Sequence, residues 1–132
     1  MAVFQSLQEA QEFFKDDRFA TENGITIEEL SEEKCVTKLV VTERHRNAVG
    51  GVMGGAIFTL ADLAFSAHCN HLHKPSVGLQ NSISYLSGAK GDVLYATSRC
   101  TKDGRTTGFY EVEVTDNTGR LLATMSCICF KL

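Results

Sequence analysis

The sequence predicts an α+β fold in which a curved antiparallel sheet of about six strands wraps one long central helix. Residues 56–69 form the one long apolar segment; they are rich in alanine and contain no proline, which favours a helix over a strand. A helix that is apolar on nearly every side should be buried on nearly every side. Because the segments before and after it read as strands, the simplest arrangement is a sheet that curls around this helix.

Length and composition place the chain among ordinary globular proteins. Its 132 residues correspond to one domain, residues 1–132, and 43% of them are apolar and 22% charged. These values exclude a disordered chain, a collagen-like chain and a membrane protein. The net charge of −3 gives no bulk attraction to nucleic acid or to an anionic membrane, so neither is expected as a partner.

The five cysteines are an odd number in a chain too large to need disulfide staples, and no Cys-x-x-Cys pair is present. We expect reduced thiols packed as small apolar side chains, which implies a reducing cytoplasm. Residues 1–11 lack a basic region followed by an apolar core, so no signal peptide is expected. The cysteines are Cys35, Cys69, Cys100, Cys127 and Cys129.

Before the long helix, the sequence predicts a short helix and a hairpin. Leucine, alanine and phenylalanine recur at helical spacing in residues 6–17, where a serine and a glutamate three residues apart match a capping box. From Ile25 the period changes to two, and residues 36–42 form a second strand after a turn. A loop then leads to the long helix.

After the long helix, four runs read as strands. Two of their connections, residues 102–105 and 116–119, carry the glycine and the Asp or Asn residues of hairpin turns. Strands this long leave edges and faces uncovered, so we expect at least a dimer. The four runs are residues 77–86, 92–101, 106–115 and 120–131.

Two glycine pairs, Gly50-Gly51 and Gly54-Gly55, precede the long helix. Glycines at a helix start let a ligand approach backbone N–H groups that have no partner within the helix. These donors and the positive end of the helix dipole suit an oxyanion, or a carbonyl that becomes one. The alternative is tight packing of the helix start against strands.

Asp62 lies two turns into the apolar helix, on a narrow polar stripe with Thr59, Ser66 and Cys69. A buried carboxylate must be paired, hydrogen-bonded or protonated. Asp62 is therefore either a structural aspartate bonded to a neighbouring hydroxyl, or a general base or nucleophile that faces a pocket between subunits.

Several other residues admit two interpretations. Asn47 is a common turn former, or it orients a reacting group near the glycines. Lys90, Lys102 and Arg105 are solvated loop charges, or together they contact the phosphates of a nucleotide-bearing group. Four large side chains either belong to the core or line a pocket: Phe58, Leu63, Phe65 and Tyr85.

The histidines do not predict a metal site. His68, His71 and His73 gather near Cys69 at the end of the long helix, but they lack the separated ligand pairs of zinc sites. Positive charge near a helix C-terminus is favourable in itself. His45, in the loop before the helix, is expected to be structural or exposed.

Residues 47–62, NAVGGVMGGAIFTLAD, resemble the signature of the hotdog-fold acyl-CoA thioesterases, in particular the PaaI-like (phenylacetate-degradation) branch. That signature has an asparagine, a His-Gly-Gly six residues later, and the aspartate of Leu-Ala-Asp nine residues after the histidine. Asn47, Gly54, Gly55 and Asp62 hold the matching positions. Residues 83–86 and 102–105 extend the resemblance, which spans about residues 25–131.

The resemblance implies a hotdog fold and hydrolysis of acyl-CoA thioesters, with coenzyme A as part of the substrate and no separate cofactor or metal. It also implies that two subunits join edge to edge as a homodimer, which often pairs again into a homotetramer. Each active site would then lie at the dimer interface.

The resemblance also implies residue roles. The N–H of Gly54 would polarise the thioester carbonyl, while Asp62 of the other subunit activates water or attacks directly. Asn47 would position the water or the acyl group. Substrate-binding roles follow for Met53, Gly55, Thr59, Lys90, Gly104 and Arg105.

The chain departs from the signature at Met53, which stands where the family has histidine. A thioether is neither an acid nor a base and accepts hydrogen bonds poorly. Either catalysis continues through the helix start and Asp62, or the domain is a non-catalytic acyl-CoA-binding module. A hotdog dehydratase or isomerase is disfavoured, because those enzymes usually use a histidine with a carboxylate.

Overall fold

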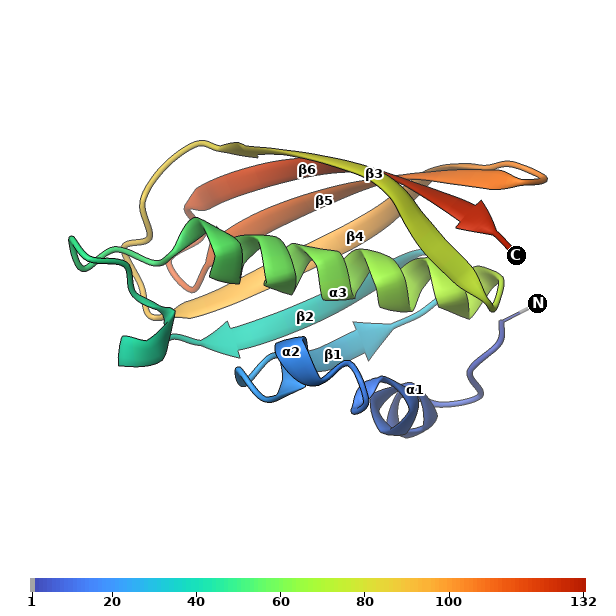
Figure 1. Cartoon of the computed structure of the whole chain (residues 1–132), viewed down its shortest axis with the longest axis horizontal. Helices are drawn as coiled ribbons and strands as arrows, with labels where there is room; N and C mark the ends of the chain where they lie inside the picture. Colours follow the sequence, from blue (N-terminus) through green and yellow to red (C-terminus); the bar gives the residue numbers. More distant parts are fainter. Residues whose placement is uncertain (1) are drawn as a thin grey trace.

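The computed structural model describes residues 2–132, in which six antiparallel strands form one sheet and helix α3 (Gly54–Leu72) packs along one face of it (Figure 1). The strand order is β1-β2-β4-β5-β6-β3, and α3 contacts all six strands. The predicted α+β fold is therefore confirmed. The strands are β1 (Thr26–Leu30), β2 (Lys34–Val40), β3 (Ser76–Tyr85), β4 (Val93–Asp103), β5 (Thr107–Asp116) and β6 (Leu121–Lys131).

Helix α3 has 19 residues and extends beyond the predicted segment at both ends. It begins at Gly54, directly after the extended Met53, and it ends at Leu72, shortly before Pro75. A proline disfavours helical geometry in the residue before it, which accounts for the stop. No helix within residues 2–132 is long and apolar enough to span a lipid bilayer.

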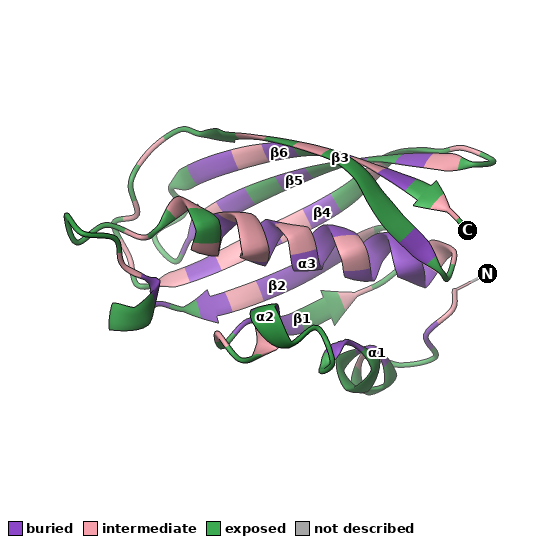
Figure 2. Ribbon diagram, in the orientation of Figure 1, coloured by how far each residue is buried: buried purple, intermediate pink, exposed green. Residues whose placement is uncertain are grey.

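The expectation that α3 is buried on nearly every side is wrong. One stripe of the helix, which includes Thr59, Asp62 and Ser66, is only half-buried, whereas Cys69 on the same stripe is buried (Figure 2). The physical reason is that a single sheet covers only one side of a helix. Asp62 is therefore partly open to solvent in the single chain.

The N-terminal segment contains two helices instead of one. Helix α1 (Leu7–Phe14) begins as predicted, with the Ser6 hydroxyl accepting from the Glu9 N–H at 3.0 Å. It ends before residue 17, and a four-residue helix, α2 (Arg18–Thr21), follows and packs against α3. The predicted loop before α3 also contains a short 3-10 helix, η1 (Glu43–His45).

Strand β3 forms an open edge of the sheet. The other edge, β1, has only five residues and is contacted by α1, whereas β3 has ten residues and most of them are exposed. Its exposed apolar side chains include Val77 and Leu79, which are 45% and 58% exposed. A long edge strand with exposed apolar groups is suited to pairing with another strand.

Asp116 fixes the β5–β6 turn to the loop before β4. Asp116 is 2% exposed as a residue, and one of its carboxylate oxygens accepts from the N–H groups of Lys90 and Gly91, at 2.7 and 2.9 Å. The other oxygen accepts from the Thr118 N–H and hydroxyl and from the Arg120 N–H. Hydrogen bonds from the Thr118 hydroxyl and from the N–H groups of Gly91, Lys90 and Thr118 lower the pKa of Asp116 below its usual range.

We expect Asp116→Asn to lower the melting temperature by several degrees at pH 7, because one N–H-accepting oxygen becomes an NH2 group that faces donors. A lowered pKa stabilises the fold above the unfolded pKa, and this stabilisation is lost as the pH falls. The difference between the variant and wild type should therefore shrink below about pH 4. Thermal unfolding followed by circular dichroism measures both effects.

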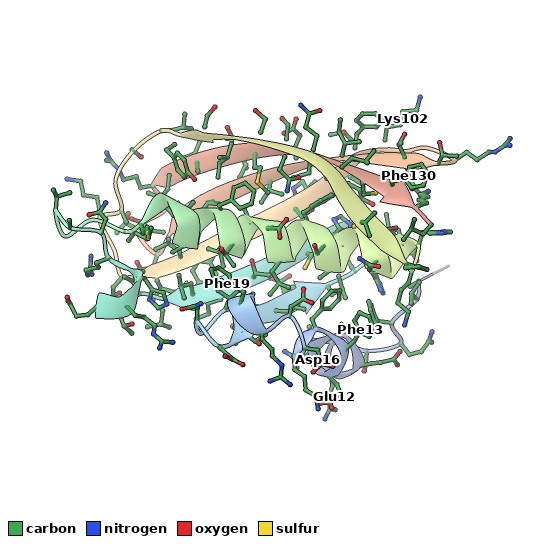
Figure 3. All side chains as sticks on the ribbon, viewed as in Figure 1. Glu12, Phe13, Asp16, Phe19, Lys102 and Phe130 are labelled. Atoms are coloured by element: carbon green, nitrogen blue, oxygen red, sulfur yellow. The ribbon has the colours of Figure 1, made fainter. Side chains whose placement is uncertain are left out.

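The matched control is Asp16→Asn, at an exposed aspartate on the protein surface (Figure 3). It should leave the melting temperature unchanged at both pH values. Equal melting temperatures for Asp116→Asn and wild type would show that this carboxylate does not hold the turn.

Candidate active site

The start of α3 presents unused backbone donors. The N-cap residue Met53 makes no side-chain cap, and within residues 2–132 no acceptor meets the N–H groups of Gly54 and Gly55. They lie at the positive end of a 19-residue helix dipole. This arrangement suits a carbonyl oxygen that gains negative charge during a reaction.

Tyr85, from the end of β3, stands over this helix start. Its hydroxyl donates to the Gly54 carbonyl oxygen at 3.0 Å, and a Cβ atom at position 54 would lie 3.1 Å from the Tyr85 ring. The close approach leaves little room for a side chain at residue 54. Tyr85 was expected either to belong to the core or to line a pocket. It lines a pocket, and 52% of the residue is exposed.

Asn47 builds the loop that leads to the helix. Its side-chain oxygen accepts from the N–H groups of Val49 and Gly51, at 3.1 and 3.0 Å, and its own N–H donates to the Gly51 carbonyl at 2.8 Å. Gly50 has a φ of 87°, which favours glycine. Asn47 is thus a turn former, and its NH2 group is the part that remains for a ligand.

His45 is buried and structural, which is one of its two predicted states. Its Nδ1 atom accepts from the Thr42 N–H at 2.9 Å, so the proton lies on Nε2, which donates to the Asn23 carbonyl at 2.6 Å. Its backbone carbonyl accepts from the Met53 N–H at 2.8 Å. His45 therefore connects the segment after α2 to the residue that precedes Gly54.

Asp62 is a half-buried carboxylate between α3 and β3. Its Oδ1 atom accepts from the Asn81 side-chain NH2 at 3.2 Å. Desolvation raises the pKa of Asp62, the Asn81 hydrogen bond opposes this, and the nearby Asp17 adds to the rise. The carbonyl oxygen of the Asn81 side chain is buried and has no partner within residues 2–132. Asp62 is therefore a more basic carboxylate than a solvated aspartate.

Gly54 and Asp62 cannot act on the same atom within one chain. They are eight residues apart on one helix, which separates them by about 12 Å along its axis. The candidate residues Met53, Gly55 and Thr59 do come together: they line one apolar pocket of about 560 Å³ next to the helix start. The Thr59 hydroxyl donates to the Gly55 carbonyl at 2.7 Å.

The three predicted phosphate-binding cations do not come together in one chain. Lys90 lies beside Asn47 and Gly54 around a second, more polar pocket of about 870 Å³. Lys90 precedes the first residue of β4, whereas Lys102 and Arg105 lie at the last residues of this strand and just after it (Figure 1). The two ends of β4 are about 34 Å apart. Gly104, in the same turn, is glycine because a Cβ atom would lie 2.6 Å from a backbone oxygen.

The remaining candidate groups serve the fold. His68 is buried and bonded to the Ser98 hydroxyl and the Glu32 carbonyl, and residues 2–132 contain no cluster of three metal-ligating side chains. The five cysteines are free thiols, and four of them are buried. Burial raises the pKa of both Cys35 and Cys127 to about 12, which keeps these thiols protonated.

The family model of the thioesterase superfamily matches residues 49–123, which include Gly54, Asp62 and Asn81. The chain belongs to the thioesterase superfamily. It is 32% identical over 117 residues to the acyl-coenzyme A thioesterase PaaI of Escherichia coli, with 88% of this chain and 84% of that protein covered. It is also 33% identical over 103 residues to human acyl-coenzyme A thioesterase 13, covering 75% and 74%.

Solved thioesterase structures share the hotdog fold of this chain. The structure of Escherichia coli PaaI superposes with a TM-score of 0.88 at 28% identity, covering 95% of this chain and 91% of that one. A hypothetical thioesterase protein from Streptococcus pneumoniae, solved with coenzyme A, has a TM-score of 0.80 at 30% identity, covering 89% of this chain and 94% of that one. The resemblance to PaaI-like hotdog thioesterases is confirmed.

Two residues of this candidate site were not predicted from the sequence. Asn81 donates to Asp62, which lies 19 residues earlier in the sequence, and Phe19 of α2 lines two pockets beside α3. Neither residue belongs to the Asn47–Asp62 signature. Only tertiary packing brings them to the site, and the sequence carries no signal for that packing.

We expect His45→Phe to lower the free energy of unfolding by about 3 kcal/mol, because the Asn23 carbonyl and the Thr42 N–H both lose their partner in a buried place. Urea unfolding measures this change. His73→Phe is the control: His73 forms one exposed hydrogen bond, and its loss should cost far less. Equal losses for the two variants would contradict the structural role of His45.

Proposed function

We propose that this thioesterase hydrolyses acyl-CoA thioesters to the free acid and coenzyme A, at a site assembled from two copies of the chain. The observation that carries the proposal is the placement of two complementary groups on one rigid helix. Gly54 supplies a free N–H donor for an oxyanion and Asp62 supplies a basic carboxylate, about 12 Å further along α3. A second copy of the chain would bring its Asp62 close to the Gly54 N–H of the first copy.

Similar proteins support coenzyme A thioesters as the substrate class. The relatives from Escherichia coli and from human are named acyl-coenzyme A thioesterases. A structure from Streptococcus mutans, 30% identical with a TM-score of 0.76 and covering 81% of this chain and 87% of that one, is described as bound to acetyl-CoA.

The proposed reaction begins when the thioester carbonyl oxygen accepts a hydrogen bond from the Gly54 N–H. Asp62 of the partner subunit takes a proton from water, and the hydroxide adds to the carbonyl carbon. The C–S bond of the tetrahedral intermediate then breaks, and the sulfur takes the proton from Asp62. Direct attack by Asp62, followed by hydrolysis of the anhydride, gives the same products. Neither route calls for a metal or a cofactor.

We propose a homodimer in which two β3 strands pair edge to edge. The exposed length of β3 and its apolar side chains support this edge as the contact. Such pairing would set two α3 helices beside each other with their half-buried stripes at the interface. A homotetramer would form by a further pairing of dimers.

Substrate contacts would divide between the two pockets. The more polar pocket beside Lys90 and Asn47 suits the coenzyme A part, and the NH2 group of Asn47 is available to position water or the carbonyl. Gly104 and Arg105 would reach the coenzyme A phosphates only from a neighbouring subunit. Because the cysteines are free thiols, we propose a cytoplasmic location.

A non-catalytic acyl-CoA-binding module is the second candidate function. Met53 carries this alternative, because its thioether stands where the family has histidine and lies beside the helix start. The two candidates differ in one respect only, the turnover of a bound thioester.

We expect Asp62→Asn to lower kcat by about 10³-fold, because the carboxamide cannot accept the proton from water. Release of free thiol from aryl- and alkyl-CoA substrates measures the rate. The exposed Asp16→Asn is the control and should leave kcat unchanged. Turnover by Asp62→Asn at the wild-type rate would remove Asp62 from the mechanism.

Wild-type protein that binds CoA esters and releases no thiol would instead be the binding module. In that case Met53→His, which restores the family residue, should produce thiol release. Failure of both proteins to bind CoA esters would contradict both candidate functions.

We expect Asn81→Leu to move the acid limb of the pH profile of kcat/KM to higher pH. The base works when deprotonated, so the rate falls as the pH drops through the pKa of Asp62, which burial already raises. Removing the Asn81 hydrogen bond disfavours the anion and raises this pKa further. The neighbouring Ser82→Ala should leave the limb in place, and an unmoved limb in Asn81→Leu would exclude Asn81 from tuning Asp62.

A further inference from the structure

An apolar pocket of about 560 Å³ lies beside the helix start, between α2, the end of β2 and the first turns of α3. We propose that it holds the acyl group of the substrate, that this group is an apolar alkyl chain or aryl ring, and that Phe19 at its mouth favours long chains by packing against their outer end. This inference rests on the proposed function. The apolar walls include Phe19, Ile25, Leu39, Ala56 and Phe58.

Each polar side chain around this pocket donates a hydrogen bond to a backbone carbonyl. Asn23 donates to the Phe19 carbonyl, Arg44 to that of Glu22 and Thr59 to that of Gly55, each at 2.7 Å. His45 and Tyr85 likewise donate to carbonyls, at 2.6 and 3.0 Å. The interior thus offers a ligand apolar surface, while the guanidinium of the exposed Arg44 lies at the rim.

The pocket has the right position for an acyl group. Met53 and Gly55 line it, Gly54 lines the polar pocket next to it, and Tyr85 lines both. A thioester carbonyl held by the Gly54 N–H would therefore lie at the boundary between the two pockets. The acyl group then extends into the apolar pocket and the coenzyme A part into the polar one.

The roof of the pocket, formed by residues 22 and 23 after α2, is held in place before a ligand binds. Arg44 and His45 of η1 bind the carbonyls of Glu22 and Asn23, directly after α2. A preformed pocket lowers the conformational cost of binding. Phe19 projects from α2 beside α3 (Figure 3) and is 77% exposed, so a bound chain would cover it.

The test uses S-ethyl-, S-hexyl- and S-decyl-CoA thioethers, which cannot be hydrolysed, and measures each Kd by calorimetry. For the wild type we expect the affinity to rise about fourfold per methylene until the pocket is full. Phe19→Ala should weaken the decyl compound about tenfold relative to the ethyl compound. Phe13→Ala, at another partly exposed phenylalanine that lies on α1, should keep the wild-type ratio.

A second variant, Ala56→Leu, places a larger side chain in the pocket and reduces the space for a ligand. It should also lower the decyl-to-ethyl affinity ratio, by about tenfold. Equal affinity of the wild type for all three thioethers would overturn the proposal, as would wild-type ratios in both pocket variants. Because the thioethers report binding alone, these results are independent of turnover. Absence of thiol release from every acyl-CoA would overturn the hydrolytic function. It would not change the measured dependence of Kd on chain length, which tests the acyl pocket separately.

Discussion

The packing of α3 against a single sheet is the constraint on which the rest of this structure depends. The sheet buries one side of the helix and leaves the stripe with Thr59 and Asp62 half-buried. The same rigid helix holds the free N–H groups at Gly54 away from the carboxylate of Asp62. The geometry of one helix therefore keeps these two groups apart, which is why the proposed reaction uses two chains.

His45 couples the two parts of the site that differ in chemistry. Its imidazole holds the Asn23 carbonyl in the roof of the apolar pocket, while its own carbonyl receives the Met53 N–H just before the helix start. A shift of the roof would thus be transmitted to the residue that positions Gly54. Asp116 has a similar function on the polar side, where its carboxylate holds the N–H groups of Lys90 and Gly91.

The elements predicted correctly are those whose signal is local. Alternation and turn residues were sufficient for the strands, and the alanine-rich segment for α3. The short helix α2 and the 3-10 turn η1 are too short to show a periodic signal, and the side chains of η1 bind carbonyls that follow α2 more than 20 residues earlier in the chain. The same reason explains why Asn47, Gly54 and Asp62 were found in one contiguous motif, whereas Asn81 and Phe19 became site residues only through the fold.

The pocket around Met53 shows what this residue contributes to the site, which the sequence alone does not show. A histidine there would add a polar ring to a pocket whose other polar side chains each donate to a backbone carbonyl. A thioether extends the apolar wall up to the carbonyl-binding N–H groups instead. Hydrogen bonds to the developing oxyanion usually lower the barrier of such reactions more than any other interaction does. The proposed mechanism assigns this role to the backbone of α3 and therefore needs no imidazole. The exchange removes a polar group at the carbonyl and adds contact area for an apolar acyl chain.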